Sequence, residues 1–251
     1  MRFEIGTDES DMFHLYETFA ATGALNRALL NYTMTKSTPV PTPYNFAFTG
    51  ASMKLPDFLH LARYITDNDL HDRLSELSPD RIMRRENQRT NRREFQELIK
   101  RYRALTPHQR ELLLELDAEG RKQLSFLAIC KTYAFLADFT CYLVREKFRL
   151  MDYQLTDVDM RRFLNQRAAD HPELDTFAES TLKKAKQVTW LMLEEGGWID
   201  GAQTRRLQPQ FPDARLLGAT AADHPRWLEI YLLPPNELNR LYDRYRTERS
   251  L

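Results

Sequence analysis

The sequence predicts an all-α fold of two helical domains, the first helix-turn-helix-like and the second winged-helix-like with a small β-hairpin. Three observations predict this. The chain has 251 residues, which exceeds the common size of a single domain. It is rich in Leu, Glu, Arg and Ala and holds only eight Gly, a balance that favours helix over sheet. Apolar residues recur at intervals of three and four along most of the chain, as they do on amphipathic helices.

The first 43 residues are expected to form an arm apart from the two domains. Residues 11–32 show helical spacing of apolar side chains, whereas residues 33–43 read TMTKSTPVPTP. Three prolines at alternate positions favour an extended, polyproline-like backbone. The chain is predicted to divide into four parts. Residues 1–43 form an arm with a proline-rich linker, 44–150 a helix-turn-helix-like bundle, 151–218 a winged-helix-like domain and 219–251 a tail with a helix.

The first domain is expected to begin with three short helices. Phe58, Ala62 and Ile65 lie on one apolar stripe, and a second short helix fits residues 69–77. Ser78-Pro79-Asp80 supplies an N-cap, a proline at the first helical position and an acid in the first turn. Three short helices within roughly fifty residues are typical of a helix-turn-helix unit.

Longer helices are expected to follow. Phe95, Leu98 and Tyr102 recur at the intervals of one buried helix face. Thr106-Pro107-His108-Gln109 then has the pattern of a capping box with proline at the first helical position. Gly120 is placed to end the helix that this box begins.

Residues 124–150 carry apolar side chains on too many faces for a surface helix, so we expect one central helix there. Lys131 and Asp138 interrupt its most membrane-like part, which favours a buried core helix over membrane insertion. Cys130 and Cys141 would lie about 16 Å apart on such a helix, too far for a disulfide. The polar, acidic start of the chain is unlike a secretory signal, so we expect a cytoplasmic location.

The second domain is expected to hold two helices and a hairpin. Thr156 with Asp159 begins the first helix, and Thr176 with Glu179 forms a capping box for the second, which Gly196-Gly197 ends. Residues 198–200 and 205–211 are then expected to pair as two short strands around a polar turn. Helix, helix and small hairpin is the order of a winged-helix domain. An apolar piece, two prolines and a charged helix complete the tail.

Composition limits the possible functions. The 36 basic and 36 acidic residues give a formal net charge of zero, which argues against a protein that coats a polyanion with its whole surface. The sequence contains no glycine-rich phosphate loop, no H-E-x-x-H, no G-x-S-x-G and no pair of C-x-x-C motifs. We therefore expect a protein that is not an enzyme and holds no cofactor or metal. Catalysis through residues far apart in the sequence remains the weakest alternative.

A local basic cluster occupies residues 81–103, where nine basic residues face three acids, a net charge of plus six. Arginine suits phosphate and guanine because its planar guanidinium group donates two parallel hydrogen bonds. The alternative is a solvated helix face, on which Glu97 would pair with Arg93 or Arg101. The cluster follows two short helices, where a recognition helix would begin. The candidate DNA-binding residues are Arg81, Arg84, Arg85, Arg89, Arg92 and Arg93.

A second basic element lies on the helix before the hairpin. In a winged-helix arrangement this helix enters the groove, and the hairpin touches flanking phosphates. Three lysines on a helix also occur for solubility alone. The candidate residues are Ser180, Thr181, Lys183, Lys184 and Lys186 on the helix and Arg205 and Arg206 in the hairpin.

Several segments together resemble a known family. FAFTGASMKLPDFLHLARYI, RRENQRTNRREFQELIKRYRAL, LAICKTYAFLADFTCYLVREKF, HPELDTFAESTLKKAKQVTWLMLEEGGWID and RRLQPQF are similar, in order and spacing, to the BrxA family of BREX phage-resistance systems. The resemblance covers residues 46–217. It implies an all-helical accessory protein that binds double-stranded DNA, with the methyltransferase and ATPase components of the system as possible partners.

Three hypotheses follow. The leading one is duplex DNA binding by the two basic elements, with affinity dominated by phosphate contacts and weak sequence preference. The second is a protein scaffold of the defence complex, in which residues 11–32 dock as an amphipathic helix in a partner's groove. The third is RNA binding by a helical bundle with an arginine-rich segment.

Overall fold

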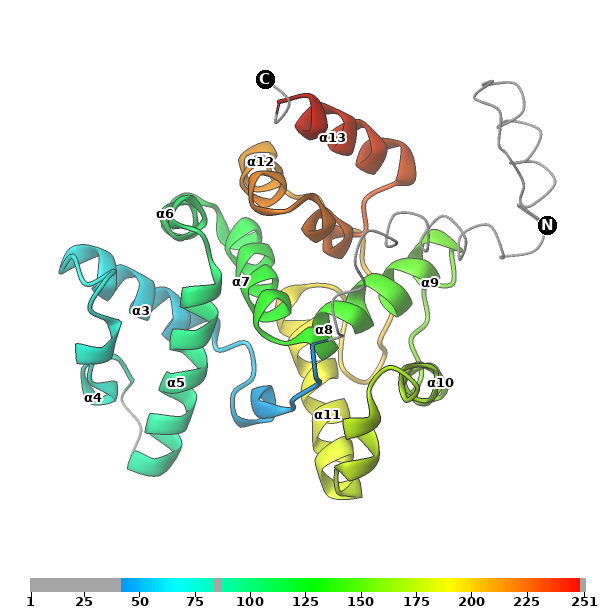
Figure 1. The fold of residues 1–251 in the computed structure, drawn as a ribbon, viewed down its shortest axis with the longest axis horizontal. Helices are drawn as coiled ribbons and strands as arrows, with labels where there is room; N and C mark the ends of the chain where they lie inside the picture. The colour runs from blue at the N-terminus through cyan, green and yellow to red at the C-terminus, as the bar shows by residue number, and fades with distance from the viewer. Residues whose placement is uncertain (1–41, 84–86, 249–251) are drawn as a thin grey trace, which may run out of the picture. The chain divides into compact units, whose positions relative to one another are not determined.

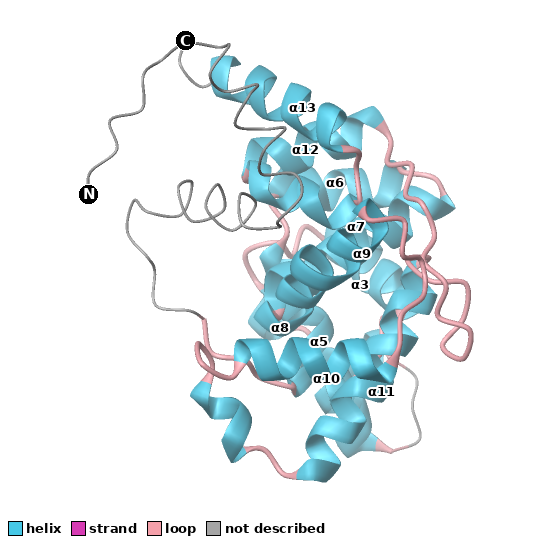
Figure 2. Ribbon diagram, turned by 90° about the vertical axis from the view of Figure 1, so that its right-hand side faces the viewer, coloured by secondary structure: helices cyan, strands magenta, loops and turns pink. Residues whose placement is uncertain are grey.

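The structure, a computed structural model, describes residues 42–83 and 87–248 (Figures 1 and 2). The chain divides after Thr42, and the unit described below is 43–251. It is mainly helical, and pairing between extended segments among the described residues is limited to two isolated bridges. The predicted all-α class is therefore confirmed. The predicted divisions at 150 and 218 fall inside this unit, and the helix expected over 11–32 lies outside the described residues.

The first described helices are short, as predicted, with one exception. A 3₁₀ turn, η1 (Ala47–Gly50), precedes α3 (Leu55–Asp67), whose predicted stripe is buried. The expected helix over 69–77 is wrong, because only the 3₁₀ turn η2 (Leu74–Glu76) forms there. Asp69 has a φ of 50°, a left-handed conformation that interrupts helical backbone.

Two helices complete this part of the fold. Ser78 occupies the predicted N-cap position of α4 (Pro79–Ile82). After three residues that are not described, α5 (Gln88–Ala104) buries Phe95, Leu98 and Tyr102, which confirms the predicted face. Helices α3, α4 and α5 pack against one another.

The capping box at Thr106 is confirmed, but the role assigned to Gly120 is wrong. Thr106 and Gln109 exchange backbone and side-chain hydrogen bonds at the start of α6 (Pro107–Glu115). Gly120 lies inside the next helix, α7 (Ala118–Thr132), where its backbone N–H donates to the Asp117 carboxylate at 2.8 Å. Asp117 thus begins a new helix before the glycine is reached.

The apolar segment expected to form one central helix is bent by 118°. It consists of α7, α8 (Ala134–Asp138), a π-helical stretch η3 (Phe139–Val144) and α9 (Arg145–Arg149). The break is at Tyr133, whose backbone is extended and whose buried hydroxyl donates to Glu97. Among the described residues, no single helix is long and apolar enough to cross a membrane, although the bent pair meets a length and composition test together.

The break also removes the straight helix on which the spacing of the two cysteines was based. Cys130 and Cys141 are nevertheless both free thiols, as expected. Burial raises the pKa of each thiol. These residues therefore contribute to packing.

The next helices contain one confirmed and one incorrect start. Thr156 and Asp159 form the predicted capping box of α10 (Asp157–Arg167). The predicted box at Thr176 does not form, because its hydroxyl donates to the Glu173 carbonyl within a 3₁₀ turn, η4 (Pro172–Thr176). Helix α11 (Glu179–Gly196) instead begins after Ala178 without a side-chain cap.

Gly197 follows α11 with a φ of 88°, in the left-handed conformation that glycine adopts without strain. The chain then turns back on itself through a short hairpin in which Ile199 bridges Leu207. The predicted hairpin is thus present only as a single bridge. The remaining chain forms α12 (Ala214–Asp223), the 3₁₀ helix η5 (Pro225–Tyr231) and α13 (Pro235–Glu248).

The buried apolar residues form one core, which extends from Tyr44 to Leu238. Helix α7 lies at its centre in Figure 1, where it contacts α5, α6 and α11. The core also includes the C-terminal part, since the buried Trp198 indole N–H donates to the Ile230 carbonyl at 2.8 Å. In addition, Lys131 pairs with Asp223 at 2.7 Å.

The segment from η1 to Met53 fixes α5 beside α11. Turn η1 packs against both helices. The Arg101 guanidinium, at the C-terminal end of α5, donates to the carbonyls of Ala51, Ser52 and Met53 at 2.7 to 3.2 Å. The Met53 N–H donates to Glu195 of α11 at 2.7 Å. The two helices that carry the predicted DNA-binding residues are therefore held by one shared strap.

Candidate nucleic-acid interface

The first predicted cluster is an open basic face on the N-terminal half of α5. Arg89, Arg92 and Arg93 are exposed, and they line one shallow hollow together with Gln88, Gln96 and Glu97. No hydrogen bond or ion pair joins their guanidinium groups to another described residue. Their guanidinium groups are therefore available to an anion. We refer to Arg89, Arg92 and Arg93 as the α5 face.

One glycine makes room for this face. The Arg93 guanidinium lies over Gly50 of η1, and a Cβ at position 50 would come within 2.8 Å of its Cζ atom. Asn87 caps the same end of the helix, accepting from the N–H groups of Arg89 and Thr90. The strap that holds the two helices thus also underlies the α5 face.

Two other parts of the first cluster differ from the α5 face. Arg81 is exposed and donates to the Tyr64 hydroxyl at 3.3 Å. Arg84 and Arg85 lie outside the described residues. Arg101 is buried, with 1% of its surface exposed, and its guanidinium lies over the Tyr133 ring. The Arg101 guanidinium therefore stabilises the fold through its hydrogen bonds to the carbonyls of residues 51–53.

The alternative ion pairs considered for α5 do not form as expected. Glu97 pairs with Lys100 at 2.7 Å, and its other oxygen accepts from Tyr133. It bonds to neither Arg93 nor Arg101. Lys100 and Tyr133 therefore occupy the Glu97 carboxylate, so it does not pair with the arginines of the α5 face.

The second predicted cluster lies on the N-terminal half of α11. Ser180, Lys183 and Lys184 are exposed, whereas Thr181 and Lys186 are half-buried. The opposite side of the helix is packed into the core, with Ala185, Val188 and Met192 buried. Helix α11 therefore has a solvent face that carries lysines and a core face.

The start of α11 has no side-chain cap for its backbone N–H groups. Because no side chain caps it, its first N–H groups are available to an external acceptor. Two exposed acids, Asp175 and Glu179, stand beside this end and lower its net positive charge. A ligand here would have to approach from the side of Lys183 and Lys184.

The hairpin is tied to the strand-like segment before α10. The Leu155 N–H donates to the Arg205 carbonyl at 3.1 Å, and the Leu207 N–H donates to the Tyr153 carbonyl at 2.7 Å. Asp200 closes the turn by accepting from the Thr204 hydroxyl and the Arg206 N–H. These bonds lower the pKa of the Asp200 carboxyl, the Thr204 bond most.

One carboxylate joins the helix to the hairpin. Asp157, the first residue of α10, pairs with Arg205 at 2.8 Å and with Lys186 at 3.4 Å. Burial tends to raise the pKa of this carboxyl, but the two cations outweigh it and the pKa lies below its ordinary value. Arg205 also lies over the Trp190 ring. We call Asp157, Lys186 and Arg205 the clamp.

The clamp changes the roles expected of its members. Lys186 and Arg205 were predicted to contact DNA as free cations, yet each already has an anionic partner. Arg206, Lys183 and Lys184 form no ion pair with another described residue, and Arg206 is exposed. Sequence reasoning missed Asp157, because its partners lie 29 and 48 residues further along the chain.

The turn between α10 and α11 is fastened to the start of the unit. His171 is buried, stacks on Tyr44 with ring centroids 3.5 Å apart and contacts Glu173 at 2.9 Å. The Tyr44 hydroxyl donates to Asp138 at 2.8 Å. His171 is thus a packed residue of the turn between the two helices. Burial raises the pKa of Tyr44, and the neighbouring Asp138 charge adds to that.

The first turns of α5 and α11 lie at the same end of the unit. The first residues of both helices point to the lower edge of Figure 1 and remain low in Figure 2, which is turned about the vertical axis.

Within residues 42–83 and 87–248, no group of three or more His, Cys, Asp or Glu side chains is arranged to hold a metal ion.

This arrangement belongs to a known family. A sequence profile described as BrxA matches residues 42–222, which is most of the described unit. The chain belongs to the BrxA family. The match begins where the arm ends and includes both the α5 face and the clamp, so both lie within the BrxA region.

Two individual proteins are also similar to this BrxA-family chain. The protein named BREX protein BrxA from Paramagnetospirillum magneticum (strain ATCC 700264 / AMB-1) is 23% identical over 166 residues, which cover 66% of this chain and 83% of the relative. A crystal structure of an uncharacterized protein from Magnetospirillum magneticum has a TM-score of 0.62 and 20% identity, with 76% of this chain and 98% of that chain covered. The second likeness establishes the fold alone.

Proposed function

We propose that this BrxA-family chain is a double-stranded DNA-binding accessory protein of a BREX phage-defence system, without catalytic chemistry of its own. The observation that carries the proposal is the unpaired α5 face, on a helix whose first turn lies at the same end of the unit as the first turn of α11. Three guanidinium groups with no carboxylate partner among the described residues suit phosphate oxygens. The neutral overall charge implies that a polyanion would bind at local basic patches.

The second half of the proposal concerns α11 and the hairpin. We propose a winged-helix arrangement for residues 153–207, because the chain order is an extended segment, a helix, a second helix and a hairpin, one side of which bridges the extended segment through Arg206 and Gln154. In such domains the second helix enters the major groove and the hairpin touches the flanking backbone. Lys183, Lys184 and Arg206 are then the contacts free to bind phosphate.

The proposal predicts the effect of removing those three cations. Lys183→Ala, Lys184→Ala and Arg206→Ala together should weaken binding to a duplex of about thirty base pairs, measured by fluorescence anisotropy. Since all three side chains are exposed, thermal unfolding should be unchanged. A matched control removes three cations elsewhere, Lys122, Arg226 and Arg240. Equal affinity in the triple variant and the unaltered protein would reject α11 and the hairpin as the contact.

A protein-scaffold role is the second candidate, and one surface favours it. Leu150 is 62% exposed and Met151 is 76% exposed, which is unusual for adjacent large apolar residues. Met151 also lines a groove of about 210 Å³, together with Arg145, Phe148, Arg149, Tyr153, Leu232, Leu233, Pro234 and Pro235. We propose that such a surface would contact the methyltransferase or ATPase component of the system.

The two candidates are separable by substitution. Leu150→Asp with Met151→Asp should abolish pull-down of the methyltransferase or ATPase component and leave DNA affinity unchanged. Deleting residues 1–43 tests the arm in the same assay. Retained pull-down after both changes would reject the scaffold role.

A further inference from the structure

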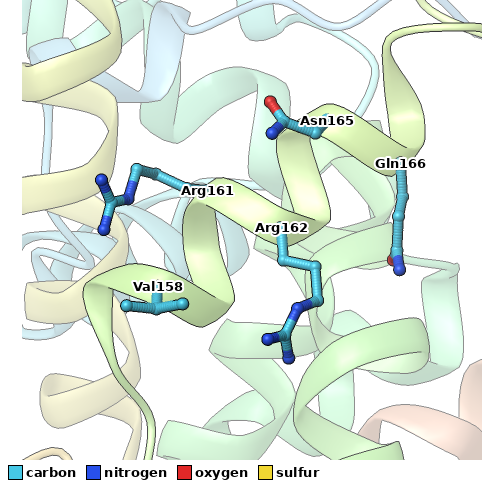
Figure 3. Close-up of a pocket in the computed structure, with 5 residues that line it drawn as sticks. All are labelled: Val158, Arg161, Arg162, Asn165 and Gln166. Atoms are coloured by element: carbon cyan, nitrogen blue, oxygen red, sulfur yellow. The ribbon is translucent and has the colours of Figure 1, made fainter.

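A helix face that the sequence did not predict as a binding site carries a second set of exposed donors, of which Arg162 alone has an acidic neighbour, at 4.0 Å. Figure 3 shows Val158, Arg161, Arg162, Asn165 and Gln166 projecting from α10, where they line a shallow hollow. The spacing of three and four residues places all five on one side of the helix. We call this set the α10 face.

The α10 face is exposed because the helix packs with its other side. Met160 and Phe163 are buried in the core, and Asp159 is buried within the capping box. The five residues of the face are all exposed, Val158 to 50%. In Figure 1 this helix lies at the right of the unit, and in Figure 2 it faces the viewer.

The two guanidinium groups of the face are not neutralised by neighbours. Arg161 forms no hydrogen bond or ion pair with any described residue. Arg162 comes only within 4.0 Å of Asp159. That carboxylate already accepts from Thr156 at 2.7 to 2.8 Å and pairs with Lys147 at 3.3 Å. Both arginines can therefore bind an external anion without breaking a strong contact.

The chemistry of the face fits a row of phosphates. Arg161 and Arg162 supply forked donors, and the amides of Asn165 and Gln166 supply neutral donors for phosphate oxygens. None of the five residues is acidic, so an approaching polyanion meets no repulsion from the face itself. A solvated helix face would more commonly alternate both signs of charge.

The α10 face continues the surface formed by α11 and the hairpin. Asp157 contacts Lys186 of α11 and Arg205 of the hairpin, and Arg161 follows Asp157 by four residues, one turn further along α10. A duplex lying across α11 and the hairpin therefore reaches Arg161 next, after passing the clamp.

We propose that the α10 face binds the phosphate backbone of the same duplex that α11 and the hairpin bind, and so lengthens the DNA footprint. This inference rests on the proposed DNA-binding function. It adds a contact outside the two basic elements, on the helix that precedes the winged-helix recognition helix.

The test compares short and long duplexes. The variant Arg161→Ala with Arg162→Ala is titrated with duplexes of about twelve and about thirty base pairs over a range of salt concentrations. The two duplexes are compared by the slope of log affinity against log salt and not by affinity itself. A longer duplex offers more overlapping sites, which raises its apparent affinity. On the long duplex the slope should become shallower by roughly 1.8, from two lost phosphate contacts. On the short duplex it should stay the same.

The control pair is Arg226→Ala with Arg240→Ala, which removes the same charge from η5 and α13. An unchanged slope on the long duplex, or an equal loss on both duplexes, would overturn the α10 contact while DNA binding itself stands. Failure of the unaltered protein to bind either duplex would overturn both proposals.

A second measurement does not depend on affinity. Since the native thiols of Cys130 and Cys141 are buried or half-buried, a Gln166→Cys variant can carry a thiol-linked photoreactive group at that position. The label at 166 should crosslink the long duplex, whereas the same label in an Arg240→Cys variant should not. Equal yields from the two positions would contradict the proposal.

Discussion

The α5 face and the clamp are both basic, but their cations are partnered differently. Arg89, Arg92 and Arg93 on α5 are unpaired among the described residues and line a hollow. In the clamp, Lys186 and Arg205 share the Asp157 carboxylate. A phosphate can therefore bind the α5 face directly, whereas at the clamp it has to compete with an internal anion.

This difference separates two uses of positive charge. The α5 face has no structural task that we can identify, which leaves it for a ligand. The clamp joins α10, α11 and the hairpin, so its cations stabilise the fold first. Binding energy should consequently come mainly from the α5 face and from Lys183, Lys184 and Arg206.

The largest expected effect comes from a cation on α5 that is not part of the face. Arg101→Met would leave the carbonyls of residues 51–53 without their buried donor, and should destabilise the protein by about 3 kcal/mol. Denaturant unfolding measures this loss. The salt dependence of DNA binding by the folded fraction should not change. A shallower slope would instead mean that Arg101 contacts DNA, and would contradict the distinction between Arg101 and the α5 face.

Removal of the α5 face should have the next largest effect. Arg89→Ala, Arg92→Ala and Arg93→Ala together should flatten the slope of log affinity against log salt by roughly 2.7 if each arginine meets one phosphate. Stability should be unaffected, since all three side chains are exposed. An unaltered slope, with the control variant of Lys122, Arg226 and Arg240 as reference, would remove the face from the interface.

Opening the clamp should act in the opposite direction. Asp157→Asn removes the internal anion and releases Lys186 and Arg205, so DNA affinity should rise by about fivefold, equivalent to an ion pair of about 1 kcal/mol. Anisotropy at fixed salt measures this. A fall in affinity would mean that Asp157 mainly positions the two cations, and that they bind DNA while still paired with it.

The smallest effect is the dependence of the clamp on pH. Because the pKa of Asp157 in the folded protein lies below its ordinary value of 3.8, the clamp stabilises the fold above that value and loses this contribution as pH falls through the folded pKa. The unaltered protein should exceed Asp157→Asn in stability by less than about 1 kcal/mol at pH 7. The gap should close as pH falls through the folded pKa of Asp157, in thermal unfolding measured across pH.

Local signals explain what the sequence predicted correctly. The capping boxes at Thr106 and Thr156 and the glycine after α11 depend on residues within a few positions of one another. The buried faces of α3 and α5 follow from periodicity alone. The basic cluster near Arg89 was recognisable from composition.

Contacts between distant residues explain the errors. Tyr133 breaks the central helix where its hydroxyl reaches Glu97, and no local pattern marks this position. Arg101 looked like its neighbours, yet it is buried against residues 51–53. Arg161 and Arg162 were missed because α10 also carries acids, and only the fold shows that Asp157 pairs with Lys186 and Arg205 on other elements.

The most direct test of DNA binding is fluorescence anisotropy of a labelled duplex of about thirty base pairs, titrated with the full chain at several salt concentrations and challenged with unlabelled duplex RNA of equal length. Tight binding that RNA does not displace, with a log–log slope near roughly −5 for about six phosphate contacts, is the predicted result. Absence of binding at low salt would contradict the account, and displacement by RNA would favour an RNA-binding protein instead.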